Sequence, residues 1–220
     1  MNKVLLSLSL VGMFFLASCG GNAITVETTD AQEESVASME AETFAVDTNV
    51  SSATWRGFKF FHDASKPEEG HYGPIKLKSG ELLLSEGVLE SGKLVADLNT
   101  LESADLADNA KSKGDLEGHL KSADFLDVEK FPEATFVITD VKALAEGDYN
   151  TEISGNLDFR GIPKNITFKA NVKHEGDNVS LQSEEIVINR QDFGMNFVGG
   201  GESVIKDEVV LQLDIKANKA

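Results

Sequence analysis

Hydrophobic and polar residues alternate along most of the chain after residue 43, and a period of two is typical of β-strands with one buried face. Residues 152–160 show this most clearly, with an apolar face made of Ile153, Gly155, Leu157 and Phe159. After the turn-forming residues 161–163, the pattern returns on Ile166, Phe168, Ala170 and Val172. The two segments are therefore predicted to form a β-hairpin.

Similar alternation recurs on both sides of this hairpin, at residues 53–61, 80–85, 94–98, 135–141, 179–189 and 209–215. At least eight strands joined by short turns are expected to close into a sandwich or a barrel, because one open sheet would expose an apolar face and two unpaired edges. The fold class predicted from the pattern is all-β.

Helical signals are confined to residues 103–130. Asp115 is expected to cap a turn that contains Leu116 and Leu120, and Ser122 or Asp124 is expected to cap a second turn before Phe125. Pro132 then ends this short helical segment.

The N-terminus carries a different, continuous apolar run from Val4 to Ala17, preceded by Lys3. Its length of about 14 residues is short of the roughly 17–25 that span a bilayer, so residues 1–18 are interpreted as a signal peptide. The run ends in Leu-Ala-Ser-Cys, which looks like a bacterial lipobox and predicts lipidation of Cys19. A small core cysteine behind an ordinary secretory signal is the alternative.

Residues 19–42 are predicted to be the lipidated cysteine and a disordered acidic tether, because residues 20–42 contain no basic and no aromatic side chain to anchor them. The folded domain is therefore expected at residues 43–220. Lipid on Cys19 would hold this domain at a membrane without spanning it.

The net charge, the cysteine count and the aromatic content exclude several kinds of partner and cross-link. The formal net charge is -17, with no basic cluster, which argues against a nucleic-acid partner. A single cysteine allows no intramolecular disulfide. Of the 13 Phe, only Phe14 and Phe15 lie in the leader, whereas Trp and Tyr are scarce. The domain therefore favours apolar contact over sugar stacking.

No pattern in the chain indicates a catalytic or metal site. The histidines lack His-x-His and HExxH spacing, and the group formed by His62, Asp63, Glu68, Glu69 and His71 is expected by chance in so acidic a chain. No nucleophile elbow, phosphate loop or dinucleotide motif occurs. We expect no metal, no cofactor and no enzymatic activity, with a hydrolase or isomerase around His71 or His119 as a weaker alternative.

Three runs in order resemble the YceI-like family. They are residues 118–136, GHLKSADFLDVEKFPEATF; residues 155–164, GNLDFRGIPK; and residues 189–195, NRQDFGM. The first is similar to the family's run HL-x-S-x-D-F-F-D-V, with Leu126 where the family usually has Phe. The resemblance covers nearly the whole domain and implies an extended, antiparallel, lipocalin-like β-barrel of about eight strands.

The resemblance also implies a function. Family members are periplasmic proteins that bind polyisoprenoid lipids, so the chain is expected to be a non-enzymatic carrier that holds an isoprenoid-type lipid inside the barrel, in the bacterial cell envelope. The barrel would lie in the periplasm or at the surface, with a homodimer as an alternative to the monomer. The expected ligand-binding residues are Trp55, Phe125, Phe136, Phe159, Phe168, Phe193 and Phe197. The alternative is a structural or surface-interaction lipoprotein with a filled barrel and no ligand.

Overall fold

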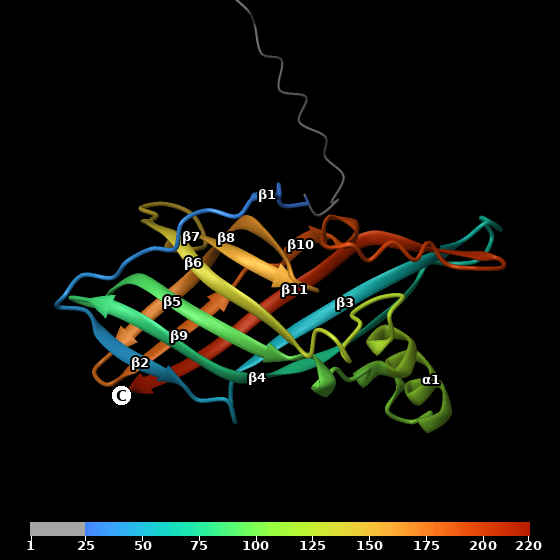
Figure 1. The fold of residues 1–220 in the computed structure, drawn as a ribbon, viewed down its shortest axis with the longest axis horizontal. Coiled ribbons are helices and arrows are strands. Elements are labelled where there is room, and N and C mark those ends of the chain that lie inside the picture. The colour runs from blue at the N-terminus through green and yellow to red at the C-terminus, as the bar shows by residue number, and fades with distance from the viewer. Residues whose placement is uncertain (1–24) are drawn as a thin grey trace, which may run out of the picture.

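The computed structural model describes residues 25–220, which form an antiparallel β-barrel with one α-helix near one end (Figure 1). Within these residues the strands are β1 Thr29–Asp30, β2 Glu42–Val46, β3 Ser52–Phe61, β4 Glu69–Ser85, β5 Val88–Asp97, β6 Glu133–Ala143, β7 Thr151–Phe159, β8 Ile162–Glu175, β9 Asn178–Ser183, β10 Ile186–Asn189 and β11 Ser203–Lys219. The helix is α1 Ala110–Lys121, and short 3₁₀ turns are η1 Leu98–Thr100, η2 Ala104–Leu106 and η3 Arg190–Phe193.

The strands form a closed barrel with eight strand positions around its circumference. β2 and β3 both pair with β4 on one side and β11 on the other, so they occupy one position, interrupted at residues 47–51. β9 and β10 likewise share one position beside β11, while β1 lies outside the ring. Pairing of β9 with both β8 and β11 completes the barrel. The predicted lipocalin-like barrel of about eight strands is confirmed.

The alternation sets which side chains fill the interior. On β7 every second residue is buried, from Thr151 to Phe159, and on β8 Ile166, Phe168 and Ala170 point inward with it. Gly155 belongs to this inward set because a Cβ there would lie 2.2 Å from the ring of Phe136. The predicted hairpin and its buried face are therefore confirmed.

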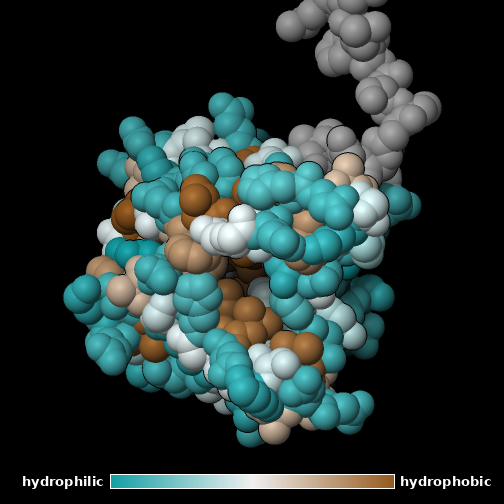
Figure 2. Space-filling view, turned by 90° about the vertical axis from the view of Figure 1, so that its right-hand side faces the viewer, coloured by the Kyte–Doolittle hydropathy of each residue, from teal (hydrophilic) through white to brown (hydrophobic). Residues whose placement is uncertain are grey.

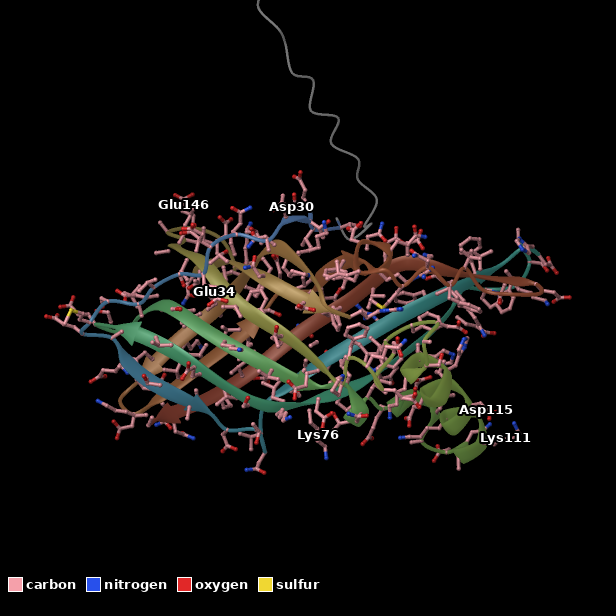
Figure 3. The ribbon with its side chains drawn as sticks, in the orientation of Figure 1. Asp30, Glu34, Lys76, Lys111, Asp115 and Glu146 are labelled. Atoms are coloured by element: carbon pink, nitrogen blue, oxygen red, sulfur yellow. The ribbon has the colours of Figure 1, made fainter. Side chains whose placement is uncertain are left out.

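The helix starts earlier than the sequence predicts. Asn109 caps α1, its side chain accepting a hydrogen bond from the backbone N–H of Ser112 at 3.1 Å. Asp115 lies inside the helix and pairs with Lys111 on its outer side, so the expectation that Asp115 caps a turn is wrong (Figure 3). Ser122 ends the helix and begins the turn that carries Phe125.

Residues 25–42 follow the outside of the barrel, and we call them the strap. They cross β8, β7, β6 and β5 before entering β2, as Figure 1 shows along the upper edge. The prediction of a disordered tether is therefore wrong for residues 25–42, which lie along the barrel in a defined path. The predicted signal peptide at 1–18 and Cys19 lie outside the described residues.

The strap is ordered because it meets backbone groups that the barrel leaves unpaired. β8 and β10 separate near one end, and the strap enters the gap: Val26 N–H donates to the carbonyl of Val187 at 2.7 Å, while β1 pairs with Lys164 and Asn165. Further along, the pairing of β6 with β7 shifts register beside Ile138. The Ile138 carbonyl accepts the N–H of Ser35 at 3.0 Å. Such bonds need no particular side chain, so composition did not reveal them.

Candidate functional site

A cavity of about 330 Å³ opens at the end of the barrel beside α1. Figure 2 looks into this end and shows hydrophobic side chains at the bottom of a hollow with a hydrophilic rim. The walls come from β3, β11, α1 and the loop after η3. Its apolar side chains are Trp55, Phe58, Ile75, Leu101, Leu116, Leu120, Phe125, Leu126, Phe159, Ile188, Met195, Phe197, Ile205, Val209 and Leu211.

The cavity brings together four of the seven residues expected to bind the ligand, namely Trp55, Phe125, Phe159 and Phe197. They come from β3, the turn after α1, the end of β7 and the loop after η3. Their roles in binding stay predictions, but their positions make one continuous apolar wall possible.

The other three expected residues lie in the packed core instead. Phe136 and Phe168 contact each other with ring centroids 5.4 Å apart, away from the cavity wall. Phe193 is fully buried and packs edge-on against Phe159 at 5.6 Å. Alternation places all three inside correctly, but the packing fills the space around them.

Trp55 presents only an apolar surface to the cavity. Its indole N–H donates to the carbonyl of Glu102 at 3.0 Å, so the one polar atom of the side chain is already paired. Gly73 lets this segment approach: a Cβ at Gly73 would lie 1.9 Å from the same carbonyl oxygen. The close contact between β4 and residue 102 therefore fixes the orientation of the ring.

Arg160 fixes the turn that carries Phe125. Its guanidinium donates to the carbonyl of Ala123 at 3.3 Å and to that of Phe125. The ring of His119 also packs edge-on against two aromatic rings, with its centroid 5.0 Å from that of Phe125 and 4.9 Å from that of Phe197. Two of the runs that carry the family resemblance thus meet at this wall of the cavity.

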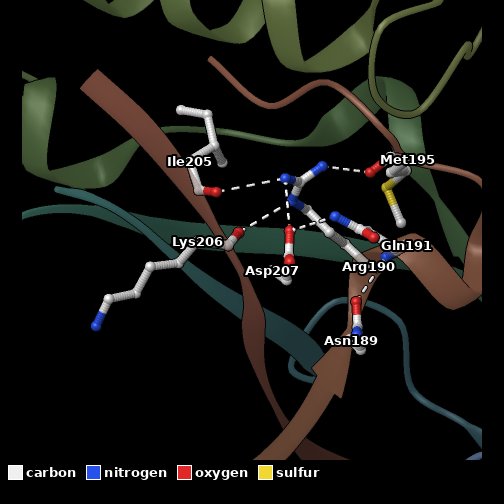
Figure 4. Close-up of polar contacts among 7 residues, drawn as sticks. All are labelled: Asn189, Arg190, Gln191, Met195, Ile205, Lys206 and Asp207. Atoms are coloured by element: carbon white, nitrogen blue, oxygen red, sulfur yellow. Dashed lines mark hydrogen bonds and ion pairs between the residues drawn. The ribbon is translucent and has the colours of Figure 1, made fainter. Parts of the chain in front are cut away.

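Arg190 stabilises the opposite wall. It is 1% exposed, and it donates from Nε to the Lys206 carbonyl at 2.9 Å and from Nη2 to Asp207 at 2.8 Å (Figure 4). It also donates to the carbonyls of Met195 and Ile205. Burial lowers the pKa of the guanidinium and Asp207 opposes this change, so the group stays charged. Arg190 therefore joins η3, β11 and the loop after η3 with four of its five N–H donors in use.

Two imidazoles line the cavity on the side of α1 and η2, and each pairs with a carboxylate. Nδ1 of His71 lies 2.7 Å from Oδ2 of Asp105, and Nε2 of His119 lies 3.1 Å from Oδ2 of Asp124. Burial raises the pKa of the Asp105 carboxyl, but hydrogen bonds from His71 and from the backbone N–H of Tyr72 outweigh this effect, and the pKa lies below its usual value.

No three His, Cys, Asp or Glu side chains between residues 25 and 220 gather as a metal site would require. In that same range, no helix is long and apolar enough to cross a membrane. Of the cavity-lining residues, Ser203 alone carries a hydroxyl group. What the arrangement offers chemically is an apolar surface with two imidazoles at its edge.

Sequence reasoning missed much of the wall. His119, Leu120, Leu126, Arg190 and Met195 line the cavity, and all five belong to runs that resemble the family. These runs were the available signal for them. Phe58, Ile75, Leu101 and Ile188 carried no such signal, because an apolar residue gives the same sequence pattern in a core and in a cavity.

Comparison with known proteins agrees with this architecture. The YceI-like domain model matches residues 28–217. A UPF0312 protein of Pseudomonas putida is 35% identical over 120 residues, which cover 54% of this chain and 53% of that protein. The chain thus aligns with about half the length of the first curated relatives it matches.

Two solved structures share the fold. BcnA of Burkholderia cenocepacia superimposes with a TM-score of 0.58 at 19% identity, covering 79% of this chain and 99% of BcnA. A polyisoprenoid binding domain of Saccharophagus degradans, implicated in plant cell wall breakdown, superimposes with a TM-score of 0.54 at 14% identity, covering 80% and 98% of the two chains.

Proposed function

Because the chain belongs to the YceI-like domain family, we propose that it is a non-enzymatic carrier that holds an isoprenoid-type lipid in the cavity at the end of the barrel. The observation that carries this proposal is the apolar wall built by Trp55, Phe125, Phe159 and Phe197. The fold is shared with the polyisoprenoid binding domain of Saccharophagus degradans, which supports the same ligand class.

The size and chemistry of the cavity support a ligand rather than bulk water. Its volume of about 330 Å³ lies within the range of roughly 300–1,000 Å³ typical of ligand sites. Each buried CH₂ is worth about 0.8 kcal/mol, so a five-carbon isoprenoid unit contributes at most about 4 kcal/mol before association costs are subtracted. A few units in the cavity would therefore suffice for stable binding.

A lipoprotein with a filled barrel is the competing function, and the open cavity argues against it. Turnover at a His–Asp pair is the other alternative. A His–Asp pair such as His71 with Asp105 can act as a general base, but a hydrolase of the usual kind also needs a nucleophile placed beside the base. Ser203, the one hydroxyl of the cavity wall, bonds to the carbonyl of Gly200 and to neither imidazole, so we favour binding over catalysis.

We further propose that the carrier is anchored through lipid on Cys19 to a membrane of the bacterial cell envelope, with the barrel in the periplasm or at the surface. The sequence Leu16-Ala17-Ser18-Cys19 supports this anchor. Two or more acyl chains on one residue hold a protein at a bilayer stably.

The test is extraction and mass spectrometry of lipid that copurifies with the full-length protein. We expect a long isoprenoid-type chain at a fixed molar ratio to protein. A Leu120→Glu variant places a carboxylate in the cavity wall and should lose that lipid, because burying the charge against an apolar chain is costly. Phospholipid alone, in equal amounts in both samples, would contradict the proposal.

A further inference from the structure

The polar groups around the cavity differ in whether they are free to meet a ligand. Four of the five N–H donors of Arg190 are used within the protein. At the rim, Lys59 pairs with Glu69 at 2.9 Å and Lys206 pairs with Glu68. Each imidazole uses only one ring nitrogen, and no hydrogen bond among residues 25–220 reaches the second nitrogen of His71 or His119.

The position of the proton on His71 follows from its partner. The carboxylate of Asp105 accepts from the N–H of Tyr72 at 3.1 Å as well as from the imidazole, and these bonds keep it ionised. An ionised carboxylate only accepts hydrogen bonds, so Nδ1 of His71 must carry the hydrogen. In the neutral ring, Nε2 is then left with a lone pair and acts as an acceptor.

In His119 the roles of the two nitrogens are exchanged: Nε2 faces Asp124 and carries the hydrogen, and Nδ1 is the acceptor. His71 is the better candidate of the two for a ligand contact. Its side chain is 26% exposed and Asp105 is 17% exposed, against 41% and 56% for the His119 pair. A hydrogen bond to His71 is therefore less open to competition from water.

We propose that His71 binds the polar end of the lipid and that this end is a hydroxyl group, which donates to Nε2. The inference rests on the proposed carrier function and names its ligand class as long-chain alcohols. A carbonyl or ether oxygen accepts hydrogen bonds but cannot donate one to the lone pair of Nε2. The corresponding ethers and ketones therefore bind more weakly than the alcohols.

The experiment compares farnesol with farnesyl methyl ether, which share one chain and differ in the donor hydrogen. Binding to the purified full-length protein, in one detergent, is followed by the fluorescence of Trp55, the chain's single tryptophan and part of the cavity wall. All binding measurements are made at a single pH of about 8, above the ordinary titration range of an imidazole. We expect farnesol to bind roughly three- to tenfold more tightly, the range for one neutral hydrogen bond.

Two variants separate this role from a structural one. His71→Phe should abolish the preference for the alcohol over the ether, so the ratio of the two affinities should fall to about one. Asp105→Asn should act differently, because an amide N–H facing Nδ1 moves the ring proton to Nε2 and makes it a donor. The ether should then bind about three- to tenfold more tightly than to wild type, the gain of one neutral hydrogen bond.

The control is His62→Phe, since His62 is exposed and lies outside the cavity wall, and this variant should keep the wild-type preference. Circular dichroism verifies that each variant is folded. Equal alcohol-to-ether affinity ratios in wild type and His71→Phe would overturn the inference while the carrier function stands, and so would loss of the preference in His119→Phe alone. If neither probe binds wild type, the carrier function itself fails.

Discussion

At the scale of single residues, Arg190 is fully buried in η3 and has four hydrogen-bond partners, three in β11 and one in the loop after η3, so it joins three segments. Arg190→Lys keeps the charge but cannot reproduce the planar donor fork, so buried carbonyls are left unpaired. We expect the free energy of unfolding to fall by about 3 kcal/mol, measured by urea denaturation. The matched change Arg56→Lys affects an exposed pair with Glu185 and should cost little. Equal losses would mean that Arg190 does not hold the three segments together as described.

Phe125 and Phe193 provide a second test at this scale, because one lines the cavity and the other is packed core. Phe193→Leu should lower the free energy of unfolding by about 1 kcal/mol or more, since the smaller side chain leaves a void. Phe125→Leu enlarges an existing space, so its main effect should be a shift in the chain length of copurifying lipid. Mass spectrometry and thermal melts of both variants decide the assignment, and a reversed pattern would refute it.

At the scale of elements, the strap depends on Asn156 of β7. Its side chain accepts from the N–H of Gln32 at 2.9 Å and donates to the carbonyl of the same residue at 2.8 Å. Asn156→Ala should release this crossing and speed amide exchange around Gln32 by roughly tenfold, the effect of one or two lost hydrogen bonds. Hydrogen-exchange mass spectrometry measures it.

Ser154→Ala is the matched control for the strap, since Ser154 lies on the same outer face of β7 and bonds to Thr167. In the Ser154→Ala variant, the rate of amide hydrogen exchange around Gln32 should equal that of wild type. Unchanged exchange in Asn156→Ala would show that the other bonds of the strap, such as the backbone bonds of Val26 and Ser35 and the pairing of β1 with β8, hold it without Asn156.

At the scale of the whole molecule, the strap brings the start of the described chain, Thr25, onto the barrel. Cys19 lies six residues earlier, and such a segment spans at most about 20 Å. If Cys19 carries lipid, the barrel is held close to the bilayer. Cys19→Ala should then move the protein from the membrane to the soluble fraction without changing its melting temperature. Membrane association that survives a high-salt wash would contradict the anchor.

The sequence alone determined the strands and the all-β class, because a period of two places alternate side chains on one face of a strand wherever the strand lies. The hairpin of β7 and β8 and the buried positions of Phe159 and Phe168 follow from local pattern in this way. The resemblance to the YceI-like family then selected a barrel over a sandwich. The resemblance carried by residues 118–136 pointed to the part of the chain that forms one wall of the cavity.

Only the tertiary structure decided which inward residues meet empty space. Alternation separates inside from outside but not the open end of a barrel from its filled middle, so Phe136 and Phe168 could not be told from Phe159. The pairing of His71 with Asp105 joins residues 34 positions apart, and the strap is held in part by backbone groups that leave no mark in composition. Both arise from contacts that exist only after the strands have closed.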